Sequence, residues 1–126
     1  MNESTPVPAK CNGAVTTPIG RTHLALAEIE KERQRQRTKW GERLDQQHVV
    51  WLSILMEEVG EAAKEINDIM GAITQAKIRI QPDMYRNTDE MINQIVKEQK
   101  IRYLQEVIQV AAVATAMIEQ IQEELK

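Results

Sequence analysis

Apolar residues recur at steps of three and four over long stretches of this chain. Between residues 49 and 74 the recurring positions are Leu52, Leu55, Met56, Val59, Ala63, Ile66, Met70 and Ile73. At about 100° per residue they fall on one stripe of an α-helix. The spacing predicts a helix over about Val49–Thr74, with charged residues on its other side.

A second long helix is predicted from Thr88 or Asp89, either of which can cap it, to Lys126. The stretch contains no Gly or Pro, and it forms either one helix or two joined near Lys97–Lys100, where polar residues crowd. Residues Leu104–Met117 are apolar almost all round, which is typical of a helix buried on most sides.

A shorter helix is predicted over about Thr22–Thr38, with Gly41 as its stop. The stretch Lys77–Asn87 contains Pro82 and is expected to form a long loop, with a short extended piece as the alternative. Residues 1–18 hold three of the four prolines and are expected to be a disordered or extended tail.

The length of 126 residues fits one domain, here residues 19–126 after the tail. Phe is absent and aromatic residues make up 3%, so the core must be aliphatic. Such a core favours an all-α fold of helices packed on helices. Three helices leave Leu104–Met117 short of partners within one chain. We therefore expect a homodimer or tetramer, most simply a two-fold dimer with a four-helix core.

The net charge of −3 and pI of about 5.5 argue against direct binding to nucleic acid. Cys11 is the single cysteine, so no internal disulfide can form, and a cytoplasmic protein is expected. The first residues lack the pattern of a signal peptide. No apolar run reaches the length of about 20 residues that a membrane span needs, so no membrane association is expected.

Three carboxylates, Glu57, Glu58 and Glu61, lie within about one turn of the first predicted long helix. The simplest interpretation is the solvated face of an amphipathic helix. However, Glu57 and Glu61 are like charges four residues apart, which repel each other. Gly60 lies between them, where glycine costs about 1 kcal/mol relative to alanine. A divalent cation that binds a phosphorylated substrate is one way to neutralise such a cluster.

Glu106 lies on an apolar stripe with Val110, Val113 and Met117. A carboxylate in that position must be ion-paired, protonated or metal-bound. Gln109 follows one turn later, and its amide oxygen can bind a hard cation or a water molecule. The chain has only two histidines and no Glu-x-x-His pair, which argues against zinc and di-iron sites.

Basic residues cluster before the first long helix, and they are Lys31, Arg33, Arg35, Arg37, Lys39 and Arg43. They form either a solvated helix face with local ion pairs or a clamp for a polyphosphate. Trp40 is either a hydrophobic plug or a ring that stacks on a nucleobase. Asp45 and His48 either line the same opening or are ordinary turn residues.

Taken together, several segments resemble the MazG-like nucleotide pyrophosphohydrolases, in particular the short forms found in phages and prophages. The similar segments are Glu32–Gln36, Lys39-Trp40-Gly41, His48, Trp51–Glu61 and Glu106–Val113. The resemblance covers about residues 28–66 and 102–121. It implies an all-α fold and Mg²⁺-dependent hydrolysis of nucleoside triphosphates to monophosphate and pyrophosphate, with Mn²⁺ as a substitute metal.

The resemblance further implies roles for individual residues. Glu57, Glu58, Glu61 and Glu106 would bind metal or orient the attacking water, with Glu58 or Glu61 as the general base. Arg33, Arg37, Lys39 or Lys64 would bind the polyphosphate. The chain departs from the family pattern at Gln109, where the family has Asp, and in a longer stretch between Glu61 and Glu106. Two alternatives stay open, which are a relative that binds nucleotides without cleaving them and a structural oligomerisation module.

Overall fold

The computed structural model describes residues 17–79 and 85–126, and their side chains at 17–75 and 90–126. Within these ranges the chain forms three helices and no strand: α1 (Pro18–Trp40), α2 (His48–Arg79) and α3 (Tyr85–Glu124). The prediction of an all-α chain is therefore confirmed. The predicted tail lies outside the described residues, apart from Thr17 and Pro18, which begin α1.

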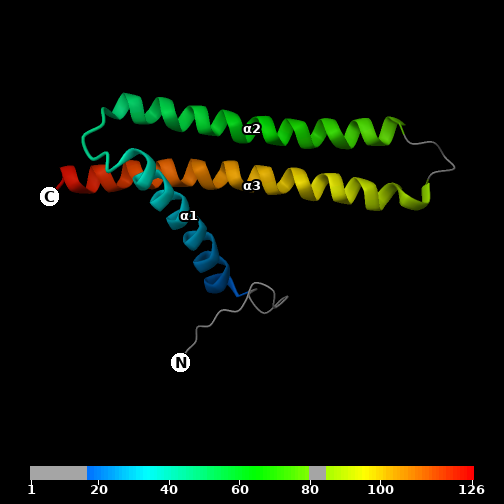
Figure 1. Ribbon diagram of the computed structural model, residues 1–126, viewed down its shortest axis with the longest axis horizontal. Coiled ribbons are helices and arrows are strands. Elements are labelled where there is room, and N and C mark those ends of the chain that lie inside the picture. The colour runs from blue at the N-terminus through cyan, green and yellow to red at the C-terminus, as the bar shows by residue number, and fades with distance from the viewer. Residues whose placement is uncertain (1–16, 80–84) are drawn as a thin grey trace.

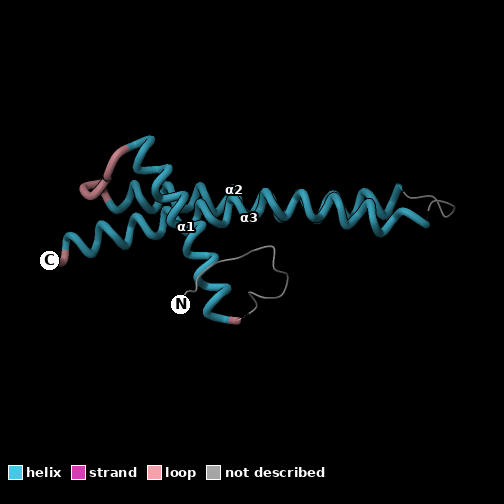
Figure 2. Tube along the Cα trace, turned by 60° about the horizontal axis from the view of Figure 1, so that its bottom comes forward, coloured by secondary structure: helices cyan, strands magenta, loops and turns pink. Residues whose placement is uncertain are grey.

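The two long helices α2 and α3 run antiparallel along the whole length of the molecule (Figure 1). The carboxyl-terminal part of helix α1 lies across α3 near the carboxyl-terminal end of α3. The amino-terminal end of α1 projects away from the α2–α3 pair at a steep angle, as Figure 2 also shows. It packs against α3 and not against α2. The connection between α1 and α2 therefore lies at the same end of the molecule as the C-terminus.

Helix α1 begins earlier than the predicted Thr22. The Thr17 hydroxyl accepts a hydrogen bond from the Gly20 N–H at 3.1 Å, and Pro18 occupies the first helical position. This pair of signals starts a helix without any apolar periodicity, which is why the pattern of apolar residues misses it. At the other end, Gly41 has φ 77° and donates its N–H to the Arg37 carbonyl at 2.8 Å, which confirms the predicted stop.

The loop predicted over Lys77–Asn87 is shorter than expected, because α2 continues to Arg79 and α3 begins at Tyr85. Helix α3 is also continuous through Lys97–Lys100, which excludes two separate helices there. Half-buried Ile92, Ile95 and Val96 lie at helical spacing in this part of α3. Packing of these residues in the α2–α3 pair stabilises both helices beyond the ends that local sequence signals predict.

The core of the single chain is small. Trp51, Val113 and Ala116 are buried together, and Ile54, Leu55 and Met117 pack around them. The stretch Leu104–Met117 is buried only in part, since Leu104 remains 56% exposed. Within the same stretch Ala112, Val113 and Ala116 are buried, so one chain covers a part of it and leaves the rest exposed.

Helix α3 between Glu90 and Glu124 is long and apolar enough to cross a membrane, by length and composition alone. The expectation that no segment reaches this limit was therefore wrong. That expectation considered only uninterrupted apolar runs. A stretch of α3 with a few charged residues is still apolar enough on average to meet the limit. A long helix in the core of a helical bundle meets the same criteria, and α3 packs along α2.

Candidate functional site

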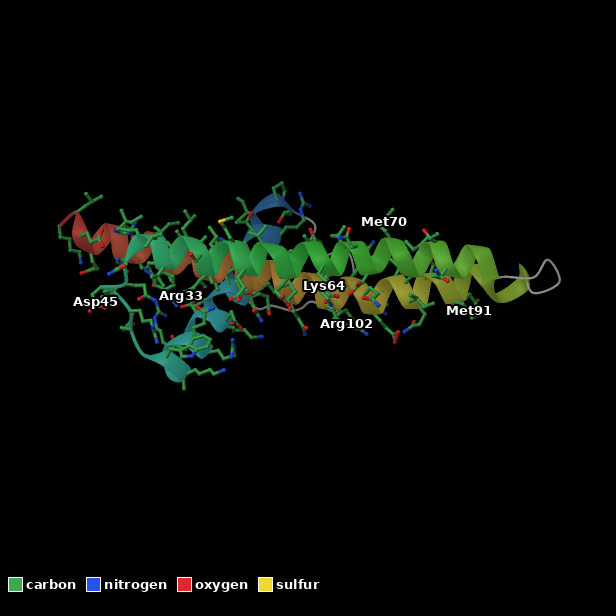
Figure 3. All side chains as sticks on the ribbon, turned by 90° about the horizontal axis from the view of Figure 1, so that it is seen from above. Arg33, Asp45, Lys64, Met70, Met91 and Arg102 are labelled. Atoms are coloured by element: carbon green, nitrogen blue, oxygen red, sulfur yellow. The ribbon has the colours of Figure 1, made fainter. Side chains whose placement is uncertain are left out.

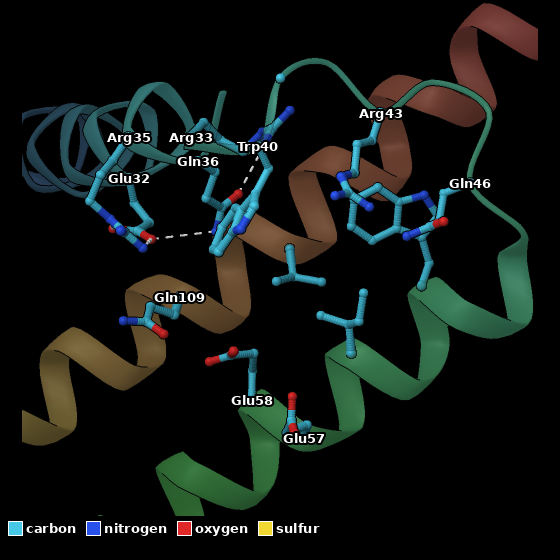
Figure 4. Close-up of a pocket in the computed structure, with 14 residues that line it drawn as sticks. Glu32, Arg33, Arg35, Gln36, Trp40, Arg43, Gln46, Glu57, Glu58 and Gln109 are labelled. Atoms are coloured by element: carbon cyan, nitrogen blue, oxygen red, sulfur yellow. Dashed lines mark hydrogen bonds and ion pairs between the residues drawn. The ribbon is translucent and has the colours of Figure 1, made fainter. Parts of the chain in front are cut away.

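A pocket of about 330 Å³ lies where α1, the connection after it, α2 and α3 meet (Figure 4). Its floor is apolar and includes Trp51, Ile54 and Val113. Its polar lining comes from all of these segments and consists of Glu32, Arg33, Arg35, Gln36, Trp40, Arg43, Gln46, Glu57, Glu58 and Gln109. The pocket thus combines acidic, basic and aromatic groups in a volume that suits a small-molecule ligand.

Glu58 is the half-buried carboxylate at the centre of the acidic side of this pocket. Burial raises its pKa, and the nearby negative charges raise it further. Those charges belong to Glu106, Glu57, Glu61 and Glu32. Carboxylates from all three helices therefore converge, and each opposes the ionisation of Glu58.

Glu106 on α3 is in a similar position. Burial raises its pKa, the charges of Glu61 and Glu65 raise it further, and Lys64 acts in the opposite sense. Glu65 was not among the predicted site residues, although its spacing of four from Glu61 places both on one side of α2. Its Oε1 atom is buried and has no hydrogen-bond partner in the part of the chain that the structure describes.

The chemistry of this cluster fits a hard divalent cation. The donors are carboxylate oxygens and the amide oxygen of Gln109, which are the ligands that Mg²⁺ prefers. The unpartnered Oε1 of Glu65 is a buried acceptor that a cation or its water ligands would satisfy. Among residues 17–79 and 85–126, no three Asp, Glu, His or Cys side chains converge closely enough to bind a metal ion.

Two of the predicted phosphate-binding arginines are engaged by Glu119. The Arg33 Nη2 atom donates to one carboxylate oxygen of Glu119 at 2.5 Å, and the Arg37 Nη2 atom donates to the other at 2.9 Å. Arg33 is buried and also donates to Gln36 at 3.0 Å, while Arg37 forms an ion pair with Glu42 at 3.0 Å. These contacts attach α1 to α3, and Arg33 reaches the pocket only as part of its wall.

The remaining cations of this region differ in how far they are neutralised. Arg35 forms an ion pair with Glu32, and that hydrogen bond raises the pKa of Arg35. Lys39 and Arg35 lie over the ring of Trp40, with 4.9 Å and 5.8 Å to its centroid. Arg43 lines the pocket and makes no ion pair with a described residue. Its guanidinium is the pocket cation with the greatest capacity for a phosphate.

A buried amide fixes the segment that carries Arg43. The Gln120 Oε1 atom accepts hydrogen bonds from the Trp51 indole N–H at 2.6 Å and from the Gln46 N–H at 3.1 Å. Its Nε2 group donates to the Gln46 carbonyl at 2.7 Å. Gln120 is 1% exposed. Through this one side chain, α3 holds two residues of the pocket lining in place, Trp51 and Gln46.

The predicted site residues divide into three groups. Five line the pocket: Arg33, Trp40, Glu57, Glu58 and Gln109. Glu61 and Glu106 lie outside its lining but act electrostatically on the same cluster. The others lie elsewhere, since His48 contacts Glu124 at 2.9 Å, Lys64 pairs with Asp68 at 3.5 Å, Lys39 covers Trp40, and Arg37 binds Glu119.

Sequence reasoning missed Glu32, Gln46 and Gln120 as parts of this site, whereas it included Arg43 in the basic cluster that could form a polyphosphate clamp. The only local signal for Glu32 was its place in the charged stretch before Trp40. In comparisons with known proteins, no family model, no curated protein and no solved structure matches this chain.

Proposed function

We propose that this protein hydrolyses nucleoside triphosphates, ribose or deoxyribose, to the monophosphate and pyrophosphate in a reaction that depends on Mg²⁺. The observation that carries the proposal is the grouping of Glu32, Glu57, Glu58 and Gln109 around one pocket. Burial raises the pKa of Glu58, and the charges of Glu106 and Glu61, which lie just outside the lining, raise it further. The same pocket contains an unpaired guanidinium and an exposed indole. Neither a surface ion-pair network nor a purely structural helix pair needs this combination.

The charge balance supports a metal-bound triphosphate. Glu58, Glu61 and Glu106 would hold the cation, with Glu57 and Gln109 beside them, and Mn²⁺ would serve as a substitute. When bound, the ion would neutralise phosphate oxygens and make a coordinated water more acidic. In its absence the carboxylates repel one another, so the pocket favours a ligand that arrives with a divalent cation.

The chain's own groups then have distinct tasks. Water attacks the α-phosphorus, a new P–O bond forms, and the bond from that phosphorus to the bridging oxygen of the pyrophosphate breaks. A carboxylate oxygen of Glu58 or Glu61 accepts the proton that the water loses. Glu58 lines the pocket and is only half-buried, so a water molecule bound beside it is within its reach.

The other end of the pocket supports binding of the nucleotide. Arg43 would contact the β- and γ-phosphates, and Arg35 would contribute if its ion pair with Glu32 opens. The ring of Trp40 is 48% exposed and offers a stacking surface for a base. The volume of about 330 Å³ lies near the lower end of the range for small-molecule sites, so part of the nucleotide would extend out of the pocket.

One observation favours a second candidate, a protein that binds nucleotides without cleaving them. Gln109 lines the pocket next to Glu58 and carries no charge. A neutral side chain at this position attracts a metal ion less strongly than a carboxylate would. Nucleotide binding measured by calorimetry, without formation of product, would support this candidate.

The test is a screen for pyrophosphate release from ribo- and deoxyribonucleoside triphosphates with Mg²⁺ or Mn²⁺. We expect release from at least one nucleotide, and a loss of about 10²–10⁴-fold in Glu58→Gln, which removes a carboxylate proposed to bind the cation or to accept the proton. Glu123→Gln is the matched control, because Glu123 is exposed and pairs only with Lys126. No product from any nucleotide, or full activity in Glu58→Gln, would contradict the proposal.

A further inference from the structure

The ion pair between Glu32 and Arg35, both on α1, lies in the lining of the pocket. The contact is bidentate. The Arg35 Nε atom donates to one carboxylate oxygen of Glu32 at 2.9 Å, and the Nη2 atom donates to the other at 2.6 Å. A guanidinium binds a phosphate through the same pair of parallel hydrogen bonds. The Glu32 carboxylate therefore occupies the edge of Arg35 that a phosphate of the substrate would need.

The two partners of this pair differ in their exposure to water. The side chain of Arg35 is 51% exposed, whereas that of Glu32 is 13% exposed. An ion pair with an exposed member contributes little to stability, so the cost for Arg35 to leave Glu32 is small. A carboxylate that is largely buried, however, needs a donor or a cation beside it. Gln36 donates only a long hydrogen bond to Glu32, at 3.4 Å, so Glu32 needs another positive partner once Arg35 leaves.

Glu32 faces the acidic side of the pocket. Burial raises the pKa of Glu58 on α2, and Glu32 is one of the carboxylates whose charges raise it further. Figure 4 shows Glu32 and Arg35 above the carboxylate of Glu58. A divalent cation bound at Glu58 would attract the Glu32 carboxylate as well, because opposite charges are screened only weakly in a partly buried site. Such a cation is thus also the partner that Glu32 would need.

We propose that Glu32 holds Arg35 only while the pocket is empty and exchanges it for a metal ion when the substrate binds. A phosphate then takes the place of Glu32 at Arg35, and the Glu32 carboxylate turns to the divalent cation or to one of its water ligands. This inference rests on the proposed function, since it concerns the phosphates and the cation of the same ligand. It adds Glu32 to the groups that contact the cation.

The exchange makes Glu32 a specificity-determining residue. A polyphosphate that carries a divalent cation supplies a partner for both Arg35 and Glu32. A polyphosphate without a cation takes Arg35 but leaves Glu32 largely buried, without a counter-charge and close to a second anion. Such an unpaired charge opposes binding, which is how a site rejects the wrong form of a ligand. The pocket should therefore select the metal complex over the free anion.

A local ion pair that only stabilises α1 is the alternative role for Glu32 and Arg35. Charged side chains are frequent along this helix, as the sticks near Arg33 in Figure 3 show. One turn earlier, Glu28 pairs with Lys31 at the same spacing of three residues. That pair is longer, at 3.4 Å, both of its side chains are at least half exposed, and neither lines the pocket. Glu28→Gln therefore removes the same charge from the same helix without changing the pocket, and it serves as the matched control.

The test is calorimetric titration of inorganic tripolyphosphate in the presence of a chelator, so that no divalent cation takes part. We expect Glu32→Gln to bind tripolyphosphate about fivefold more tightly than the natural protein, because Arg35 is no longer held by a charged partner. Glu28→Gln should bind it as the natural protein does. Arg35→Gln should bind it about fivefold more weakly, since the guanidinium that receives the phosphate is absent.

A double variant separates the exchange from a general effect of charge. If Glu32 competes with the phosphate for Arg35, Glu32→Gln should raise the affinity for tripolyphosphate much less in the Arg35→Gln background. Simple repulsion between Glu32 and the anion would instead raise that affinity by the same factor in both backgrounds, which would overturn the exchange.

Titration of Mn²⁺ without any phosphate tests the other half of the exchange. Arg35→Gln releases the Glu32 carboxylate, so Mn²⁺ should bind this variant about fivefold more tightly than it binds the natural protein. A residue that only stabilises α1 would lower the affinity for Mn²⁺ when it is replaced, or leave that affinity unchanged.

Circular dichroism shows whether each variant stays helical. If Glu32→Gln loses its helices, the Mn²⁺ titration of Arg35→Gln decides, and if Arg35→Gln loses them, the tripolyphosphate titration of Glu32→Gln decides. The exchange is overturned by equal affinities of Glu32→Gln and Glu28→Gln for tripolyphosphate, by no measurable binding of tripolyphosphate to either, or by Mn²⁺ binding to Arg35→Gln that is no tighter than to the natural protein. None of these titrations involves hydrolysis, so their outcome is distinct from that of the pyrophosphate-release screen.

Discussion

Helix α3 carries two partly buried glutamates with opposite surroundings. Glu119 receives hydrogen bonds from two guanidinium groups, those of Arg33 and Arg37. Burial raises the pKa of Glu106, the carboxylates of Glu61 and Glu65 raise it further, and Lys64 offsets this only in part. At Glu119 the nearby charges of opposite sign balance, since Arg33 and Arg37 face Glu119 and Glu42, whereas negative charge is in excess around Glu106.

The surroundings of Glu119 indicate a structural role, and those of Glu106 are the basis of the proposed cation site. The chain itself supplies the counter-charge of Glu119, and the result is an attachment of α1 to α3. Around Glu106 and Glu58 the chain supplies like charges, which destabilise the folded state unless something from outside neutralises them. We propose that a bound cation and an anionic substrate provide this neutralisation.

The largest effect on stability is expected for Glu119→Gln. It leaves the buried guanidinium of Arg33 without its counter-charge, and the free energy of unfolding should fall by about 2 kcal/mol, because the pair is only partly shielded from water. Urea denaturation measures this change. Glu123→Gln, whose partner Lys126 is exposed, should shift the free energy by less than about 0.5 kcal/mol. Equal losses in both variants would remove the contrast between the two clusters.

Stabilisation by Mg²⁺ should depend on pH. The pKa values of Glu58 and Glu106 are raised in the folded state above the ordinary value of 4.5, so their protonated forms favour folding. That contribution is fully present below the unfolded pKa and is lost as pH rises through the folded pKa. Protons therefore compete with a cation for these carboxylates more strongly at pH 5 than at pH 8.

Thermal unfolding with and without Mg²⁺ at the two pH values measures this competition. At a tenfold excess of Mg²⁺ over its dissociation constant, we expect about 1.4 kcal/mol of stabilisation at pH 8 and a smaller effect at pH 5. NaCl at the same ionic strength is the control for screening. An Mg²⁺ effect that is equal at both pH values, or that NaCl reproduces, would contradict a site at these carboxylates.

The smallest expected effect has the opposite sign to that of Glu119→Gln. Glu65→Gln removes a negative charge beside Glu106, so the metal-free protein should gain about 0.5 kcal/mol. Chemical denaturation in the presence of a chelator measures the gain. Asp68→Asn is the control, since Asp68 is exposed and already pairs with Lys64. A loss of stability in Glu65→Gln would show that its carboxylate is neutralised within the chain.

Local sequence signals were sufficient for the three helices and for the stop at Gly41. Apolar periodicity locates a helix, but its ends depend on caps and on contacts with other helices. For that reason the start at Pro18 and the continuation of α2 to Arg79 did not follow from the pattern. The clustering of Glu57, Glu58 and Glu61 is local to one turn and could be read directly.

Local sequence signals could not predict which basic residues form ion pairs within the chain and which remain available at the pocket. Arg33 and Arg37 are separated from Glu119 by more than 80 positions, and only the crossing of α1 over α3 brings them together. The same crossing leaves Arg43 unpaired at the pocket. Gln120 looks like an ordinary polar residue of a terminal helix, and its burial depends on the connection that folds over it.

The central claim is that the carboxylates around Glu106 bind a divalent cation that the chain does not replace with a charge of its own. Calorimetric titration of Mn²⁺ into the natural protein, Glu106→Gln and Glu123→Gln tests it most directly. The account predicts saturable binding in the natural protein and in Glu123→Gln, and a loss of at least about tenfold in affinity in Glu106→Gln. Undiminished binding in Glu106→Gln, or no saturable binding in the natural protein, would contradict it.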